Sequence, residues 1–169
     1  SIKALKGLNI DAAIIASPAN MHISQCNELI DLNINLLLEK PFSNNVKNIK
    51  STINKARNKK LIFFIGYNLQ YEPSIIKFKD LINKNVVGNI TSINVECKSY
   101  LPDWRPKNKY YESVSEIKKL GGGVLLELSH EIDYIILLFG KIKYVYGDFD
   151  NSKILKINTE DRADIILVT

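Results

Sequence analysis

The sequence has few cysteines and no hydrophobic run of the length that spans a bilayer. Only Cys26 and Cys97 occur in 169 residues, which is too few and too widely spaced for a disulfide framework or a zinc knuckle. The first residues, SIKALKGLNI, lack the charged start, apolar middle and cleavage site of a signal peptide. A transmembrane helix needs about 20 mostly apolar residues. We therefore expect a cytoplasmic protein with no membrane contact.

The motifs of several enzyme classes are missing as well. The sequence contains no Gly-x-Ser-x-Gly elbow, Walker loop, cluster of metal ligands or internal repeat, and we predict no metal site. The net charge of +5 could indicate nucleic-acid binding. Whether it does depends on how the lysines are distributed along the chain. The densest lysines, in residues 47–60, share helical spacing with apolar Ile49 and Ile53, as on the solvated face of a helix. We predict no nucleic-acid partner.

The first third of the sequence alternates between strand and helix patterns. The apolar runs DAAIIAS, INLLLEKPF and LIFFIGY predict three strands buried on both faces. Helical spacing fills the intervals, where Asn20 can cap one helix and Ser43 or Asn44 the next. This order with short connections is typical of a parallel, doubly wound sheet.

The pattern changes after Tyr67. The sequence predicts a helix from Pro73 to about Gly88, a long strand in ITSINVECKSYL, one apolar helix from about Val124 to Phe139, and strands in KYVYGDF and RADIILVT. We predict an α/β protein. Residues 1–68 form the second half of a Rossmann-type parallel sheet, and residues 69–169 form an α+β domain with a mainly antiparallel open sheet. A dinucleotide fold has about six parallel strands, so we expect an internal piece of a longer polypeptide, incomplete in the second domain.

Polar side chains follow two of the predicted parallel strands. They are Ser17, Asn20 and His22 after the first strand, and Glu39, Lys40 and Pro41 after the second. Open α/β sheets bind ligands at the carboxyl ends of their strands, where a lysine could protonate or orient a hydroxyl or carbonyl. Each motif taken alone is also explained by a surface ion pair or by a strand end followed by a helix cap.

The stretch LGGGVLLELSHEIDY combines three glycines with three titratable side chains. The glycines allow a ligand close to the backbone and leave free amides at a helix start. Glu127, His130 and Asp133, spaced by three, fall on one stripe of a helix, and a neutral histidine held by a carboxylate is a workable general base. The alternative is ordinary helix polarity. Burying carboxylates in an apolar helix is costly, which favours the functional interpretation.

The loop LPDWRP places Trp104 beside Arg105. An aromatic ring next to a planar cation suits a nicotinamide, a phosphate or a sugar carboxylate. Packing of the tryptophan within the loop explains the pair equally well.

The order of these motifs is more specific than any one of them. DAAIIASPANMHISQC, NLLLEKPFS, GYNLQYEPSIIKFKDLINKNVVGNI, YLPDWRP and GGGVLLELSHEIDYIILLFG together resemble the glucose-fructose oxidoreductase and inositol dehydrogenase (Gfo/Idh/MocA) family over nearly the whole chain. Within it the chain is similar to a branch with YLPDW and LSHEIDY that is often linked to surface-sugar biosynthesis.

The resemblance implies a Rossmann domain for NAD or NADP and a second domain for a sugar or sugar-nucleotide substrate, whose sheet often forms a homo-oligomer. Hydride would pass between a substrate hydroxyl or carbonyl carbon and nicotinamide, with Lys40, His130 and Glu127 as catalytic residues. The implied cofactor-binding residues are Ser17, Pro18, Asn20, His22, Glu39, Lys40, Pro41, Trp104 and Arg105. The implied substrate-binding residues are Lys40, Tyr67, Gly122, Gly123 and His130.

Three features depart from the family pattern. Glu127 stands three residues before His130, where relatives have an aspartate four before it, and Gln70 stands where many have arginine. The Gly-x-Gly-x-x-Gly phosphate loop is absent, so we expect this chain alone to bind a dinucleotide poorly. The alternative function is that of a truncated, non-catalytic relative serving as a sugar-binding or assembly module.

Overall fold

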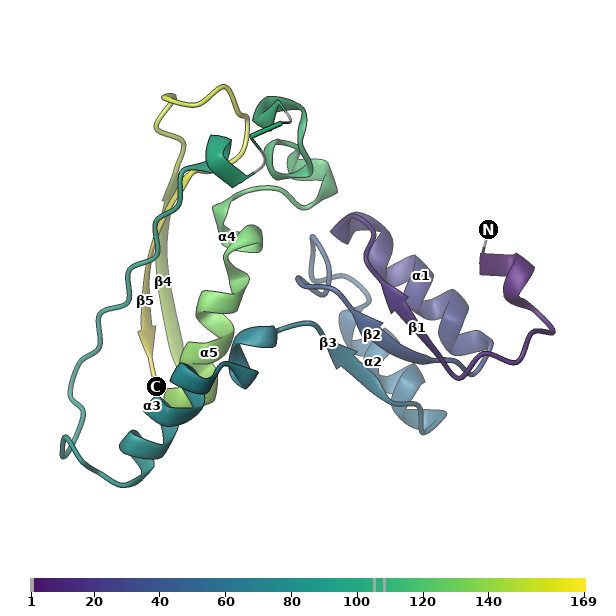
Figure 1. Cartoon of the computed structure of the whole chain (residues 1–169), viewed down its shortest axis with the longest axis horizontal. Helices are drawn as coiled ribbons and strands as arrows, with labels where there is room; N and C mark the ends of the chain where they lie inside the picture. The colour runs from purple at the N-terminus through teal and green to yellow at the C-terminus, as the bar shows by residue number, and fades with distance from the viewer. Residues whose placement is uncertain (1, 105, 108) are drawn as a thin grey trace.

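The first half of the chain is a three-stranded parallel sheet with two helices (Figure 1). The computed structural model describes residues 2–104, 106, 107 and 109–169. A 3₁₀ helix, Ile2–Leu5, precedes the sheet. The strands, in the order β1-β2-β3, are β1 (Ala12–Ile15), β2 (Asn35–Leu38) and β3 (Phe63–Ile65), and the connecting helices are α1 (Ala19–Asp31) and α2 (Ile49–Asn58). The α/β class with parallel pairing is confirmed.

The core of this half lies between one face of the sheet and the two helices. Ile15, Leu36 and Leu38 pack with the apolar side of α1, where Cys26 and Ile30 are fully buried. The opposite face carries a row of residues in register, Ile14, Leu37 and Phe64, which are 73%, 42% and 59% exposed. The prediction that the strands are buried on both faces is therefore wrong for the described chain, because its two helices cover one face.

Both helices of this half begin where the sequence did not place them. α1 follows Pro18 directly with no side-chain cap, so Asn20 lies inside the first turn. α2 begins after Asn48 rather than after Ser43 or Asn44. Local bonds hold a turn there instead: Asn45 N donates to Ser43 Oγ at 3.3 Å and Lys47 N to Asn45 Oδ1 at 2.9 Å. Such side-chain bonds compete with a helix.

The second half combines helices with an antiparallel strand pair. The 3₁₀ helices are Asn68–Tyr71 (η2), Leu101–Trp104 (η3), Tyr110–Glu112 (η4), Val114–Glu116 (η5) and Lys118–Leu120 (η6); the other elements are α3 (Pro73–Asn83), α4 (Val124–Glu127), α5 (Ser129–Phe139), β4 (Tyr144–Asp150) and β5 (Arg162–Val168). The two C-terminal strands pair along their whole length, as predicted. Among the helices that the structure describes, none is long and apolar enough to cross a membrane.

The predicted strand in residues 90–101 does not form. This segment runs extended beside the β4–β5 sheet (Figure 1), but it joins no ladder in the described chain. A groove of about 810 Å³ lies among residues 90–97, the α4 and α5 helices and β5. Apolar and polar residues of the segment both line this groove, so its alternating pattern does not correspond to a paired strand.

The single predicted helix over Val124–Phe139 is two helices. Leu128 interrupts it with φ −99° and ψ 22°, between α4 and α5. The two helices have different partners. Glu127 of α4 contacts Lys40 in the loop after β2 and Ser115 in η5, whereas α5 packs against η2 and α3. The expected stripe of residues spaced by three is interrupted between Glu127 and His130, because Leu128 changes the helical path.

Candidate active site

The carboxyl ends of the parallel strands face the second half of the chain (Figure 1). Ser17, after β1, donates from Oγ to Gln25 Oε1 at 2.6 Å. Glu39, after β2, accepts a hydrogen bond from the backbone N of Lys40 at 3.3 Å. The next peptide, Lys40-Pro41, is cis. The predicted cofactor residues of the first half therefore lie in the two adjoining loops and the first turn of α1, with the Lys40 side chain directed away from the sheet toward α4.

The buried side chain of His22 contacts both the loop after β1 and the loop after β2. Its side chain is 1% exposed, with Nδ1 2.9 Å from the Pro41 carbonyl and Nε2 2.8 Å from the Ser17 carbonyl. The sequence suggested a side chain lining the crevice, but both ring nitrogens are occupied by backbone. The physical reason is that α1 starts at Ala19, so His22 lies one turn inside the helix and faces the sheet edge. Its contribution to the crevice is to hold two loops together.

Lys40 makes a charged contact between the two halves. Its Nζ donates to the Glu127 backbone carbonyl at 2.6 Å and lies 3.8 Å from Glu127 Oε2. Ser115 Oγ donates to Glu127 Oε1 at 2.6 Å, so the carboxylate is fixed from the other side. Both members of the Lys40–Glu127 pair are about a quarter exposed. The structure therefore brings together two of the three predicted catalytic residues, 87 positions apart in sequence.

The three glycines before α4 are tightly packed against neighbouring segments. All three are buried. A Cβ on Gly121 would lie 2.7 Å from Ala19 Cβ, one on Gly122 would lie 2.4 Å from the Ser115 carbonyl oxygen, and one on Gly123 would lie 2.2 Å from Glu160 Oε1. The glycines therefore let this loop pack against α1, η5 and the irregular segment that precedes β5. Of the two predicted substrate-binding glycines, Gly123 lines a cavity.

His130 lies at the start of α5, where its carboxylate partner is Glu131. His130 Nε2 is 3.2 Å from Glu131 Oε1, and the Tyr134 hydroxyl donates to Glu131 Oε2 at 2.6 Å. Among the described residues, no hydrogen bond or ion pair joins His130 to Glu127 or Lys40. The break at Leu128 accounts for the difference between this pairing and the expected stripe. The third residue of that stripe, Asp133, is partly buried, and burial raises the pKa of its carboxyl group.

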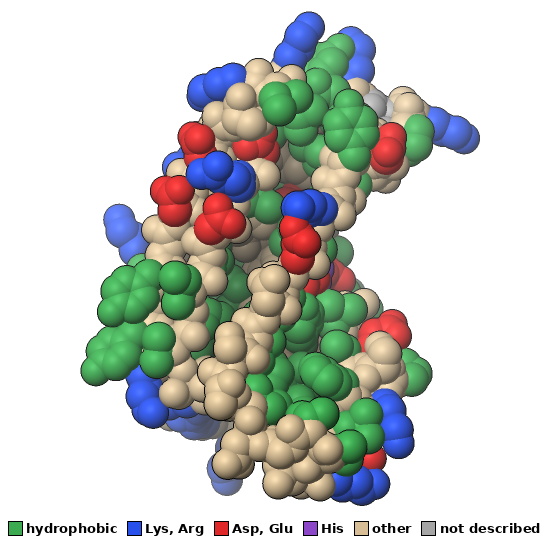
Figure 2. Space-filling model, turned by 90° about the vertical axis from the view of Figure 1, so that its left-hand side faces the viewer, with side chains coloured by type: hydrophobic (Ala, Val, Ile, Leu, Met, Phe, Trp, Pro, Cys, Tyr) green, Lys and Arg blue, Asp and Glu red, His purple; other side chains and the backbone are tan. Residues whose placement is uncertain are grey.

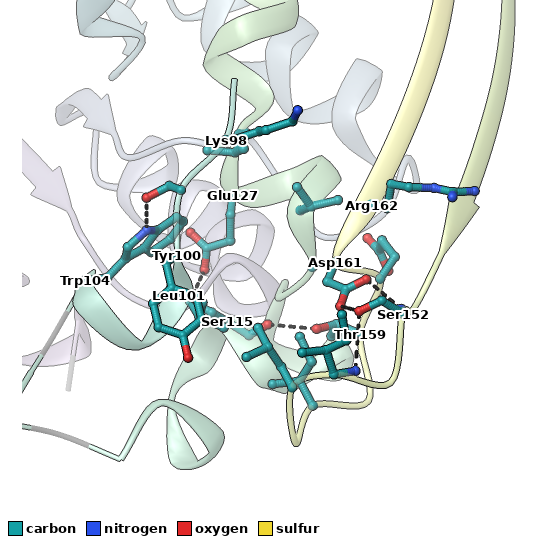
Figure 3. A pocket seen from close by; sticks show the side chains of 18 of the residues that line it. Lys98, Tyr100, Leu101, Trp104, Ser115, Glu127, Ser152, Thr159, Asp161 and Arg162 are labelled. Atoms are coloured by element: carbon teal, nitrogen blue, oxygen red, sulfur yellow. Dashed lines mark hydrogen bonds between the residues drawn. The ribbon is translucent and has the colours of Figure 1, made fainter. Parts of the chain in front are cut away.

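A cavity of about 340 Å³ adjoins Glu127 (Figure 3). The segment 97–104 forms one wall, and the residues before β5 form another; Glu127 and Ser115 lie between them (Figure 3). Trp104, predicted to close over a cofactor, lines this cavity and donates from Nε1 to Ser99 Oγ at 2.5 Å. Its neighbour Arg105 lies outside the described residues.

Tyr67 and Gln70, near the end of β3, make one side-chain hydrogen bond each. The Tyr67 hydroxyl donates to Ser129 Oγ at 3.4 Å, which links the end of β3 to the start of α5. Gln70 donates from Nε2 to the Tyr67 carbonyl at 2.9 Å. Within the described residues, no group of three or more His, Cys, Asp or Glu side chains is arranged to hold a metal ion.

Two contributors to the site were missed from sequence. Ser115 fixes Glu127, and Glu131 contacts His130. Glu131 directly follows His130 in the sequence, but helical spacing predicts contacts between residues three or four apart rather than between adjacent residues. Ser115 lies in a loop of 3₁₀ turns and carried no pattern that would have marked it.

The three parallel strands and their connecting helices form part of a Rossmann-type sheet, and a second domain follows them. Two family models match the chain: the oxidoreductase family with an NAD-binding Rossmann fold over residues 2–67, and the GFO/IDH/MocA C-terminal domain over residues 75–169. The chain belongs to the GFO/IDH/MocA oxidoreductase family.

Curated relatives are about a quarter identical to the chain over the aligned residues. Myo-inositol 2-dehydrogenase of Thermotoga maritima is 21% identical over 94% of this chain and 46% of its own length. Oxidoreductase P35 of Formosa agariphila is 27% identical over 80% of this chain and 43% of its own length. The 2,7-anhydro-N-acetylneuraminate hydratase of Mediterraneibacter gnavus is 24% identical over 78% and 34%. The chain thus spans less than half the length of these relatives.

Solved structures share the fold. The WlbA dehydrogenase of Bordetella pertussis, crystallised with NADH and UDP-GlcNAcA, aligns with a TM-score of 0.81 at 19% identity, over 99% of this chain and 48% of that one. An oxidoreductase of Thermotoga maritima aligns with a TM-score of 0.80 at 17% identity, over 98% and 51%. At this identity the likeness establishes the fold.

Proposed function

We propose that the natural product of the gene encoding this chain is an NAD(P)-dependent oxidoreductase. It transfers hydride between nicotinamide and the carbon of a sugar or sugar-nucleotide hydroxyl or carbonyl. Residues 1–68 belong to the dinucleotide domain and residues 69–169 to the substrate domain. The observation that carries the proposal is Lys40, which stands at the carboxyl end of a Rossmann strand and binds Glu127 of the other half.

The donors at the strand ends fit the nicotinamide end of a dinucleotide. An ammonium group has three hydrogens, and the Glu127 carbonyl takes one of those on Lys40 at 2.6 Å, which leaves donors for a ligand oxygen. The residues that would hold the cofactor are Ser17, Pro18, Asn20, Glu39, Lys40 and Pro41, with His22 acting through the Ser17 and Pro41 carbonyls, and with Trp104 and Arg105 from the second half. When bound, the nicotinamide supplies or accepts the hydride.

The protein groups supply positioning and proton transfer. Lys40 orients the substrate oxygen and stabilises negative charge that develops on it. His130 accepts the hydroxyl proton in the oxidation direction and returns it in the reduction direction. Glu127 holds Lys40 in place, since its carboxylate is itself fixed by Ser115. Gly123, beside the cavity, and Tyr67, linked to α5, border the substrate.

A carbohydrate substrate is supported by the lining of the cavity next to Glu127. Tyr100 and Trp104 offer aromatic surface, and Ser152 and Asp161 offer polar groups, a combination that suits a hydroxylated ring. The names of the relatives point the same way, because inositol and UDP-GlcNAcA are polyhydroxylated. A role in surface-carbohydrate biosynthesis is part of this proposal.

Turnover by variants of the natural gene product tests the function. NADH or NADPH formation is followed with a panel of inositols, free sugars and UDP-sugars. Lys40→Ala and His130→Ala should each lower kcat by about two to four orders of magnitude, because each removes a group at the reacting oxygen. Lys50→Ala, at an exposed lysine of α2, is the matched control. Near wild-type turnover in both site variants would refute the assignment. Sugar binding without turnover on any substrate would favour the non-catalytic module instead.

We further propose that the β4–β5 sheet forms a homo-oligomer interface. Tyr144 and Tyr146 face the same side as their partners Val168 and Ile166, and these four side chains are 40–65% exposed. Hydrophobic side chains gather on this side of the molecule (Figure 2). Tyr146→Asp should convert an oligomer to monomers in sedimentation equilibrium, whereas Asp148→Asn, on the same face, should leave it intact. A wild-type monomer at micromolar concentration would refute the interface.

A further inference from the structure

The carboxylate of Glu131 contacts several side chains beside His130, the proposed proton-transfer residue. One oxygen lies 3.2 Å from His130 Nε2, and the other accepts the Tyr134 hydroxyl at 2.6 Å. The Cys97 thiol, from the extended segment, is near enough to Glu131 for the carboxylate to raise its pKa. Three groups from two segments therefore surround one side chain that is 21% exposed.

The other neighbours of Glu131 act as donors. Burial, with the hydrogen bond and charge of Glu131, raises the pKa of the Tyr134 hydroxyl above its usual value. Partial desolvation and the same carboxylate raise the pKa of the Cys97 thiol, which is still exposed. Both groups therefore keep their protons at neutral pH, and an ionised carboxylate is acceptor-only. The carboxylate is fixed by its own neighbours, and Oε1 is directed to the histidine.

We infer that Glu131 is a positioning residue that holds the neutral His130 ring in the tautomer with hydrogen on Nε2, so that Nδ1 is the atom that exchanges the proton with substrate. This inference rests on the proposed function for its second clause. A neutral imidazole carries one N–H, and the group that faces each ring nitrogen decides which nitrogen holds it. Glu131 Oε1 lies 3.2 Å from Nε2, so a lone pair on Nε2 would be repelled by the carboxylate, and hydrogen on Nε2 is favoured while the lone pair remains on Nδ1. Within the described residues, Glu131 provides the one carboxylate oxygen that forms an ion-pair contact with the His130 ring.

The two glutamates, Glu127 and Glu131, contact different side chains. Glu127 contacts Lys40 and Ser115, whereas Glu131 contacts His130 and Tyr134. Each proposed catalytic group thus has its own carboxylate. An exchange of glutamate for glutamine at position 131 has a defined consequence, because the amide NH₂ is a donor. With Tyr134 still donating to the amide oxygen, the NH₂ group faces Nε2 and favours the opposite tautomer.

Nitrogen NMR on the histidine-labelled chain reads the tautomer directly. The chain has two histidines, and His130→Asn assigns their signals. At about pH 9, where histidine is ordinarily neutral, wild-type His130 should show Nε2–H, and Glu131→Gln should shift it to Nδ1–H. Glu28→Gln, at an exposed helix position, is the matched control and should change nothing. Unchanged signals of buried His22 would report an intact fold. A wild-type Nδ1–H ring, or a ring that does not respond to Glu131→Gln, would overturn the inference.

Turnover gives the second measurement. In the natural gene product, Glu131→Gln should lower kcat at least tenfold with little change in KM, since the base then carries hydrogen on the wrong nitrogen. Tyr134→Phe keeps Oε1 and should retain the Nε2–H tautomer. The NMR result needs no turnover. An inactive wild-type protein with an Nε2–H ring would therefore refute the proposed function and leave the positioning role of Glu131 standing, whereas an active one with an unresponsive ring would do the reverse.

Discussion

Gly122 gives the sharpest stability prediction. An added Cβ would lie 2.4 Å from the Ser115 carbonyl oxygen and 2.5 Å from that of Val114. Ordinary contacts begin at 3.4 Å, so the backbone would have to move by about 1 Å. Both obstructing atoms belong to the main chain, and the Ser115 carbonyl also accepts hydrogen bonds from Gly123 N and Thr159 Oγ1. The overlap therefore cannot be relieved by a side-chain rotation.

The expected cost of Gly122→Ala follows from this geometry. Overpacking a filled site costs about 1 to 3 kcal/mol, and the immobile neighbours place this substitution near about 3 kcal/mol. For a chain of this length each kcal/mol lowers Tm by about 2 to 4 °C. We expect a fall of about 6 to 12 °C in a thermal melt followed by circular dichroism.

Gly88→Ala is the matched control for that melt. Gly88 has φ +71° and nothing within 4 Å of its added Cβ, so it carries only the cost of a left-handed alanine, about 1 kcal/mol. Its Tm should fall by about 2 to 4 °C. If Gly122→Ala melts no lower than Gly88→Ala, the close packing of the glycine loop is not a source of stability.

Three further predictions concern buried groups. His22→Ala should lower the free energy of unfolding by about 3 kcal/mol, because it leaves a cavity and removes the hydrogen bond that the ring N–H donates to a loop carbonyl; a loss under about 1 kcal/mol in urea titrations would show that His22 does not hold the two loops together. Burial raises the pKa of Asp133, so its ionised form is disfavoured in the folded chain. Well below about pH 3.9 the wild type should therefore be as stable as Asp133→Asn, and it should lose stability relative to that variant as pH rises through the raised pKa. Urea midpoints that differ equally at every pH would disprove this. Burial raises the pKa of the Cys26 thiol to about 12, so at about pH 8 a thiol reagent should label exposed Cys97 and spare Cys26 until unfolding; two rapidly labelled thiols would contradict its burial.

The parallel half could be predicted from sequence because its signals are local. Continuous apolar runs ended by proline define β1 and β2, and helical spacing defines α1. The helix starts were missed because turns built by Ser43 and Asn45 use the same residue types as caps. The open face of the sheet was missed for a different reason, since a run such as NLLL looks the same whether one face or both are covered.

The second half contains the larger errors, and each comes from a tertiary contact. Alternating residues 90–97 line a groove instead of pairing with β5, and sequence alternation reports which side is apolar, not which strand accepts the hydrogen bonds. The helix break at Leu128 could not be predicted, because no glycine or proline, the usual signals of a helix break, occurs there. Lys40 and His130 are proposed from their motifs, whereas the choice between Glu127 and Glu131 as the carboxylate beside His130 depends on that break.

The glycine loop and the proposed catalytic pair are parts of one connected structure. Gly122 packs on the Ser115 backbone, Ser115 donates to Glu127, and Glu127 holds Lys40. A displacement of about 1 Å at Ser115 is enough to break a 2.6 Å hydrogen bond. In the natural gene product, Gly122→Ala should therefore lower kcat at least tenfold well below its Tm, where the protein is fully folded, because misplacement of a catalytic group by 1 Å costs up to about a hundredfold. Full activity at that temperature would show that the glycine loop stabilises the fold without positioning Lys40.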